Sequence, residues 1–230
     1  MTFMKSKKGL LERSRLYLII DKKVIKEKPI FSAARKIKGC PIDIIQLRDK
    51  ESKKESILSD AFVLRKLFSR TKTIFIINDY LDIAKIADSD GVHLGQEDPS
   101  IEIARRVLGR DKIIGVSCHN LKQAIEAEKE GADYIGIGPL FSTPTKPESK
   151  PLGLDLIRQC KKIIKIPFFA IGGINLSNIN QVLLGGAERV AICSAICQAR
   201  NISLVTRGLS KAITYGIRRR RRHKLCAHYI

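Results

Sequence analysis

The feature of this sequence that most limits its fold is a series of short apolar runs, rich in Ile, Val and Phe, that recurs along the chain. Strands that are buried on both faces of a parallel sheet read as near-continuous apolar runs of this kind. We expect eight strands, at residues 16–20, 42–47, 73–77, 91–94, 112–116, 134–137, 167–171 and 189–193.

Helix-like stretches separate these runs. Apolar residues stand three or four positions apart at Ile57, Ala61, Leu64 and Phe68, for example, which is the spacing of one helix face. Strands that alternate with helices indicate a parallel sheet, and eight such units favour a closed (β/α)₈ TIM barrel over an open doubly wound sheet. A length of 230 residues suits one barrel domain.

Apolar content and cysteine usage indicate the compartment. The longest apolar window, 166–174, is broken by Pro167, Gly172 and Gly173 and is too short to span a membrane. The run at 16–20 is too short for a signal peptide. Six scattered cysteines without a CxxC pair are typical of reduced thiols. We expect a soluble, cytoplasmic protein without a membrane partner.

The net charge of +20 is concentrated at the two ends of the chain. Residues 1–15 and 218–230 hold 11 of the 43 basic residues and 1 of the 23 acidic ones, which leaves a net charge of +10 on the body. A basic body suits anionic small-molecule substrates. The basic ends lack interleaved aromatic residues, so they do not favour specific nucleic-acid binding, although nonspecific binding of polyanions by the tail stays open.

Three segments are expected from these patterns: a basic N-terminal extension (1–14), the barrel domain (15–215) and a basic tail (216–230). The last helix should end near Ile213, with Gly216 as its C-cap. Five consecutive arginines from Arg218 repel one another, so we expect the tail to be disordered and dispensable for catalysis. A homo-oligomer is compatible with the sequence.

Polar side chains directly after strand runs are the candidate site residues, because active sites of such barrels lie at the C-terminal ends of the strands. Every run from the second onward is followed by such residues: Gln46, Arg48 and Lys50; Asn78 and Asp79; Gln96 and Asp98; Ser117 and His119; residues 138–146; Gly172 and Gly173; and residues 193–195.

Gln46, Arg48 and Lys50 alternate along a strand end, so all three side chains should project to one side. Two cations and an amide that converge suit a diphosphate. Ordinary solvated charges at an exposed strand end are the alternative.

Asp79 and Asp98 follow neighbouring strands and offer two hard oxygen ligands. Mg²⁺ is usually held by one or two carboxylates while substrate phosphates complete its octahedron. The alternative is helix capping, since each aspartate precedes a helix-like stretch.

The last three strand ends carry signs of phosphate binding. The Gly/Pro-rich loop 138–146 has hydroxyl groups and Lys146, which suit phosphate capture and a moving lid. An ordinary flexible surface loop is the alternative. Gly172 and Gly173, with Ser194 opening the last helix, match the usual phosphate site of such barrels. His93 lies inside a strand and is interpreted as a packed barrel residue, whereas His119 either faces the site or starts a helix.

The motifs QLRDK, IINDY, DGVHLGQED, GVSCH, GPLFSTPTK and IGGI followed by CSAI, in this order, resemble those of the thiamine phosphate synthase family. That resemblance implies a TIM barrel that joins hydroxymethylpyrimidine diphosphate to a thiazole phosphate with Mg²⁺, releasing pyrophosphate. A tautomerase-like branch of the family shares the barrel but should lack the full set of diphosphate and metal residues.

The resemblance also implies roles for particular residues. Asp79 and Asp98 would hold Mg²⁺, and Lys146, Ser117 and Arg48 would act in catalysis on the diphosphate. The remaining residues would bind the two substrates: Gln46, Arg48, Lys50 and Asn78 the pyrimidine diphosphate, and Thr143, Thr145, Gly173, Cys193 and Ser194 the thiazole phosphate. Cys193 replaces the aliphatic residue usual in the family and should contribute its backbone alone.

Overall fold

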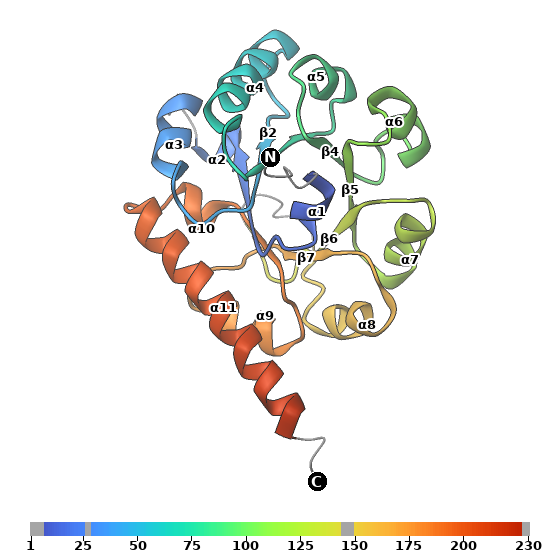
Figure 1. The fold of residues 1–230 in the computed structure, drawn as a ribbon, viewed down its shortest axis with the longest axis vertical. Helices are drawn as coiled ribbons and strands as arrows, with labels where there is room; N and C mark the ends of the chain where they lie inside the picture. The colour runs from blue at the N-terminus through green and yellow to red at the C-terminus, as the bar shows by residue number, and fades with distance from the viewer. Residues whose placement is uncertain (1–6, 26–28, 144–149, 227–230) are drawn as a thin grey trace, which may run out of the picture.

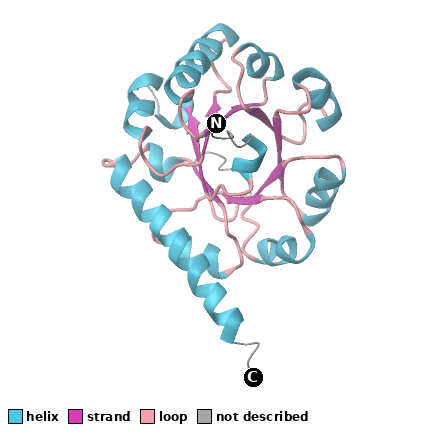
Figure 2. Ribbon diagram, in the orientation of Figure 1, coloured by secondary structure: helices cyan, strands magenta, loops and turns pink. Residues whose placement is uncertain are grey.

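Eight parallel strands close into a barrel in the computed structural model, which describes residues 7–25, 29–143 and 150–226. Figures 1 and 2 show the barrel surrounded by helices. The TIM-barrel prediction is therefore confirmed. The strands pair in sequence order, and β1 also pairs with β8. Their bounds are β1 (Leu16–Asp21), β2 (Ile44–Arg48), β3 (Ile74–Asn78), β4 (Gly91–Leu94), β5 (Ile113–Cys118), β6 (Tyr134–Ile137), β7 (Phe168–Ile171) and β8 (Val190–Ile192).

The helices after α1 follow the strands and cover the outside of the barrel. The helix bounds are α1 (Lys7–Leu11), α2 (Lys22–Ile25), α3 (Ile30–Ile37), α4 (Lys54–Phe68), α5 (Leu81–Ile86), α6 (Ile101–Leu108), α7 (Leu121–Lys129), α8 (Asp155–Ile163), α9 (Ile179–Leu184), α10 (Ser194–Cys197) and α11 (Ile202–Cys226). The apolar stripe expected on α4 faces inward, since Ile57, Ala61, Leu64 and Phe68 are all buried. No helix in the described part of the chain is long and apolar enough to cross a membrane.

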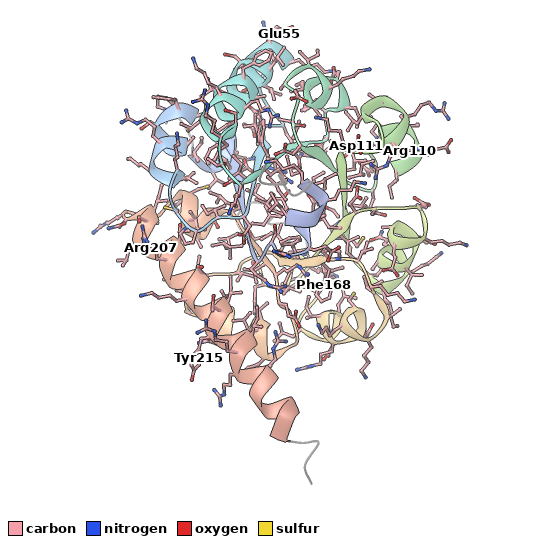
Figure 3. All side chains as sticks on the ribbon, viewed as in Figure 1. Glu55, Arg110, Asp111, Phe168, Arg207 and Tyr215 are labelled. Carbon is pink, nitrogen blue, oxygen red and sulfur yellow. The ribbon has the colours of Figure 1, made fainter. Side chains whose placement is uncertain are left out.

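Apolar side chains form two cores, one between the helices and the barrel wall and one inside the barrel. Figure 3 shows side chains filling both spaces, while Glu55, Arg207 and Tyr215 lie at the outside. Fully burying one Ile or Phe side chain stabilises a fold by ~1.5–3 kcal/mol. The buried members of the inner core are Leu11, Tyr17, Ile19, Ile44, Ile74, Ile76, Ile113, Tyr134, Phe169 and Ala191.

Helix α1 closes the N-terminal end of the barrel, and Figure 1 shows it over the barrel centre. Leu11 enters the inner core, while Lys7 Nζ lies 3.1 Å from Asp90 Oδ2 and Lys8 Nζ lies 2.8 Å from Asp133 Oδ1. The structure differs here from the predicted basic extension. Two of its lysines are paired with acids that stand just before β4 and β6, which is a long-range contact that local charge cannot reveal.

Helix α11 continues past the predicted end near Ile213 and runs to Cys226, so the predictions of a C-cap at Gly216 and of disorder over 216–226 are wrong. Gly216 allows α11 to pack closely against Leu183 of α9, because a Cβ at this position would lie 2.9 Å from Leu183 Cδ1. Ile217 packs against the outer core, and Arg220 Nη2 donates a hydrogen bond to Ala187 O at 2.6 Å. These contacts order the helix despite its charge. Residues 227–230 lie outside the described part.

Truncation after Tyr215 should lower the free energy of unfolding by ~1–2 kcal/mol, because it removes the Ile217 packing and the Arg220 hydrogen bond. No described residue of α11 lines the active-site cavity, so turnover at low temperature should stay within about twofold of the full chain. Thermal unfolding checks this, with truncation after Cys226 as the control that keeps the helix. Equal melting temperatures of the two truncated chains would contradict the prediction.

Candidate active site

A cavity opens at the C-terminal end of the barrel, and all eight strands or the loops that follow them contribute to its wall. Nearly all of the described candidates from the sequence line this one cavity. Those residues are Gln46, Arg48, Lys50, Asn78, Asp79, Ser117, His119, Thr143, Gly172, Gly173, Cys193 and Ser194. Asp98 lies beside Asp79 at the rim, in an adjoining groove. Thr145 and Lys146 lie outside the described residues.

The three candidate residues at and after the end of β2 line the cavity but differ in burial and in their polar partners. Gln46 is buried, and its Nε2 donates to Tyr17 Oη at 2.7 Å. The Arg48 guanidinium donates to Asp21 Oδ2 at the end of β1, and only 15 % of its side chain is exposed. Lys50 is half-exposed, with its Nζ 3.0 Å from Asp79 Oδ2. The alternative of ordinary solvated charges therefore does not describe Gln46 or Arg48.

Asp79 and Asp98 are brought together, and the environment of Asp79 disfavours its charge. Burial, followed by the hydrogen-bonding contact with Asp98, raises the pKa of Asp79, and the Lys50 ammonium opposes this only in part. The backbone of Asp79 adopts φ 63°, a left-handed conformation that is rare outside glycine and clusters at functional sites.

Helix capping does not explain either aspartate. The N-cap position of α5 is Tyr80, and that of α6 is Ser100, whose Oγ accepts a hydrogen bond from Ile103 N. Asp98 Oδ2 instead accepts from Gly95 N at 2.6 Å within its own loop. The capping alternative is wrong, and two adjacent carboxylates stand at the rim of a cavity whose lining includes Arg48 and Lys50.

This carboxylate pair suits a metal ion that shares its ligands with a substrate. No group of three or more His, Cys, Asp or Glu side chains that could hold a metal occurs in the described ranges. Mg²⁺ binds through one or two carboxylates plus phosphate oxygens and water, so two aspartates are sufficient for it.

The opposite wall of the cavity is made of backbone. Gly172 and Gly173 follow β7 with φ of 97° and 65°, and Ser194 begins α10 directly after β8. Glycine turns and helix N-termini present N–H groups that bind anions. The Cys193 thiol hydrogen-bonds with the Cys197 thiol, which together with burial raises its pKa, so it is not a thiolate nucleophile.

Two histidines line the cavity as well. His93 is buried on β4, as predicted, with Nδ1 3.0 Å from Tyr134 Oη and Nε2 2.9 Å from Ser117 Oγ. His119 Nδ1 donates to Gly138 O at 2.6 Å. His119 does not start α7, whose N-cap is Asn120, so it is a wall residue of the cavity.

Several known proteins resemble this chain over most of its length. The family described as thiamine monophosphate synthase matches residues 16–196. The thiamine-phosphate synthase of Halalkalibacterium halodurans is 44% identical over 189 residues, which cover 82% of this chain and 90% of that protein. The one from Shouchella clausii is 41% identical over 200 residues, covering 86% and 96% of the two chains.

The chain belongs to the thiamine monophosphate synthase family. It is an enzyme, a transferase of thiamine biosynthesis. The solved thiamine phosphate pyrophosphorylase from Pyrococcus furiosus superposes with a TM-score of 0.81 at 34% identity, covering 91% of this chain and 98% of that one. A 3-hexulose-6-phosphate synthase at 20% identity and a TM-score of 0.62 shares the fold alone.

Sequence reasoning missed three polar residues of this synthase-family site. Asp21 holds Arg48, while Tyr17 and Tyr134 place their hydroxyl groups in the middle of the barrel. All three are buried. The available signal was a polar group within an aliphatic strand run (Tyr17) or at its end (Asp21, Tyr134), because a buried polar group needs a partner.

Proposed function

We propose that this family member condenses hydroxymethylpyrimidine diphosphate with a thiazole phosphate to give thiamine phosphate and pyrophosphate. The observation that carries the proposal is one cavity with two separate walls that suit anions, the side chains that follow β2–β5 and the backbone turns after β7 and β8. Two phosphorylated reactants that must meet need two such walls facing one another.

The first wall is assigned to the pyrimidine diphosphate. Arg48 and Lys50 supply positive charge, and Asp21 holds the Arg48 guanidinium in place. Asn78 is buried at the end of β3, and its Nδ2 has no hydrogen-bond partner among the described residues, which suits an amide that donates to a ligand. Gln46, Ser117 and Lys146 complete the proposed diphosphate set.

The second wall is assigned to the thiazole phosphate. Gly173 and Ser194 offer backbone N–H groups and Thr143 a hydroxyl, with Thr145 and the backbone of Cys193 as further proposed contacts. The raised pKa of the Cys193 thiol agrees with a role for its backbone alone.

Asp79 and Asp98 would hold Mg²⁺. When bound, this ion neutralises the diphosphate as it departs. The pair has the hard oxygen donors that Mg²⁺ prefers. Burial and the neighbouring Asp98 raise the pKa of Asp79, so a bound cation would favour its charged form.

The chain's own groups stabilise charge and position the reactants. The bond between the pyrimidine methyl carbon and the diphosphate oxygen breaks with its electron pair leaving on the diphosphate, and the thiazole nitrogen donates its pair to that carbon. Arg48 and Lys50 face the developing negative charge. No side-chain nucleophile is needed on this path.

One assay tests the proposal: thiamine phosphate and pyrophosphate formed from the two purified substrates, with and without Mg²⁺. We expect equal amounts of both products and dependence on the ion. If no pyrophosphate appears although both substrates bind, the protein catalyses a different reaction and the assignment of the two walls is wrong.

A further inference from the structure

Five side chains from five strands form a continuous chain of hydrogen bonds through the barrel interior. Gln46 Nε2 lies 2.7 Å from Tyr17 Oη, which lies 2.9 Å from Tyr134 Oη. Tyr134 Oη lies 3.0 Å from His93 Nδ1, and His93 Nε2 lies 2.9 Å from Ser117 Oγ. Both ends of this chain, Gln46 and Ser117, reach the active-site cavity.

The two tyrosines in the middle are enclosed by apolar side chains. Tyr17 and Tyr134 belong to the inner core, where Tyr134 meets the Phe169 ring edge-on with centroids 5.5 Å apart. Gly115 leaves room for the Tyr134 ring, because a Cβ at that position would lie 2.1 Å from Tyr134 Cζ. Burial raises the pKa of both phenols well above the ordinary value. Each therefore keeps its single proton and can donate one hydrogen bond.

The order of the protons follows from the first donor. Gln46 donates to the Tyr17 oxygen. A buried phenol proton needs an acceptor, and when each takes the next atom of the series, the Tyr17 proton goes to Tyr134 and the Tyr134 proton to His93 Nδ1. A neutral imidazole that accepts at Nδ1 carries its proton on Nε2. His93 Nε2 must then donate to Ser117 Oγ.

We infer that this chain holds His93 in its Nε2–H tautomer and thereby leaves the Ser117 hydroxyl proton to be donated into the cavity. Its acceptor is an electron-rich atom of the bound pyrimidine diphosphate, an identification that rests on the proposed function. No other described residue accepts a hydrogen bond from this hydroxyl. Tyr17, Tyr134 and His93 are positioning residues, since they act on the ligand through Ser117.

The opposite order would have the opposite effect. If Gln46 accepted from Tyr17, every proton along the chain would reverse and the Ser117 hydroxyl would point at His93 Nε2, away from the ligand. The tautomer of His93 distinguishes the two orders, and it can be measured in the free protein without substrate.

The first test is imidazole nitrogen NMR of the full chain labelled with ¹⁵N-histidine. His93→Gln assigns the His93 signal, and we expect its Nε2 to be protonated and its Nδ1 not. His119 is an internal reference with the opposite tautomer, because its Nδ1 donates to the Gly138 carbonyl. A His93 protonated on Nδ1, or on both nitrogens, would overturn the inference whether or not the protein makes thiamine phosphate.

Tyr134→Phe tests the link within the chain, since it removes one hydroxyl and keeps the ring. We expect the His93 signals to show a mixture of tautomers in this variant. Tyr215→Phe, at a position 67% exposed on α11, is the matched control and should match the wild type. If Tyr134→Phe does not fold, Tyr17→Phe interrupts the series of hydrogen bonds one step further from His93. An unchanged tautomer in a folded variant would contradict the inference.

Kinetics provide a second readout. Tyr134→Phe and Ser117→Ala should each lower kcat/KM about tenfold, which is the worth of one hydrogen bond, and the double variant should lose no more than Ser117→Ala alone. Multiplied losses would show that Tyr134 does not act through Ser117. A wild-type protein that forms no thiamine phosphate would refute the proposed function instead, and the NMR result would still decide the inference.

Discussion

Asp79→Asn should abolish Mg²⁺-dependent turnover, with a loss of at least about 100-fold, and at the same time stabilise the metal-free protein at neutral pH. The two effects have one cause. Asp79 is held beside Asp98 in a partly buried place that disfavours its charge, so the carboxylate favours metal binding at the expense of the fold. Asn removes the charge and keeps the shape of the side chain.

The sign of the stability effect follows from proton linkage. The pKa of Asp79 is raised above 3.8, so the folded state holds this proton more tightly than the unfolded state does. That contribution to stability is present in full below pH 3.8 and is lost as the pH rises through the raised pKa. The gain in melting temperature from Asp79→Asn should therefore be largest at neutral pH and shrink under acid conditions.

Asp82→Asn is the matched control on the same segment. Asp82 is half-exposed and lines the adjoining groove, where its carboxylate is paired with Lys54. The hydrogen bond from Lys54 lowers the pKa of Asp82. Its replacement should leave turnover intact and should not stabilise the protein. Asp98→Asn should match Asp79→Asn in its loss of turnover. Near-normal turnover in both active-site variants would overturn the metal assignment.

Gly173→Ala should destabilise the fold by ~2–4 kcal/mol and weaken thiazole phosphate binding more than about tenfold, because it combines backbone strain with steric overlap. Gly173 has φ 65°, and a Cβ there would lie 2.5 Å from Ser142 O. The backbone cannot easily withdraw, since Asn178 Nδ2 donates to Gly173 O at 2.9 Å.

Gly153→Ala separates the two causes. Gly153 has φ 68°, nearly the same as Gly173, but a Cβ there would meet nothing within 4 Å. This control should show only the conformational cost, about 1 kcal/mol, with thiazole phosphate affinity unchanged. Denaturant unfolding and direct binding measure the two quantities. Equal losses in the two variants would show that overlap with the 141–142 backbone has no effect.

The barrel and most of the cavity wall were predictable from the sequence. All eight predicted strands formed within two residues of their predicted bounds, because a buried parallel strand must be apolar along its whole length. Parallel strands in a barrel also end at one face, so residues such as Asn78 and Ser117 had to converge once the strands were placed. The apolar pattern of a strand and the position of its last residue can both be recognised from a few consecutive residues.

The pairs of groups that meet across the barrel were visible only in the folded structure. Tyr17 and Tyr134 are 117 residues apart, and their hydroxyl contact exists only because β1 and β6 face each other across a closed barrel. Helix α1 closes the barrel end and α11 continues to Cys226 through equally distant contacts, with Asp90, Asp133 and Ala187. The sequence had predicted a basic extension for the first segment and disorder for the end of the second. Neither periodicity nor composition carries information on such long-range pairs, because their partners become neighbours only after the strands have closed the barrel.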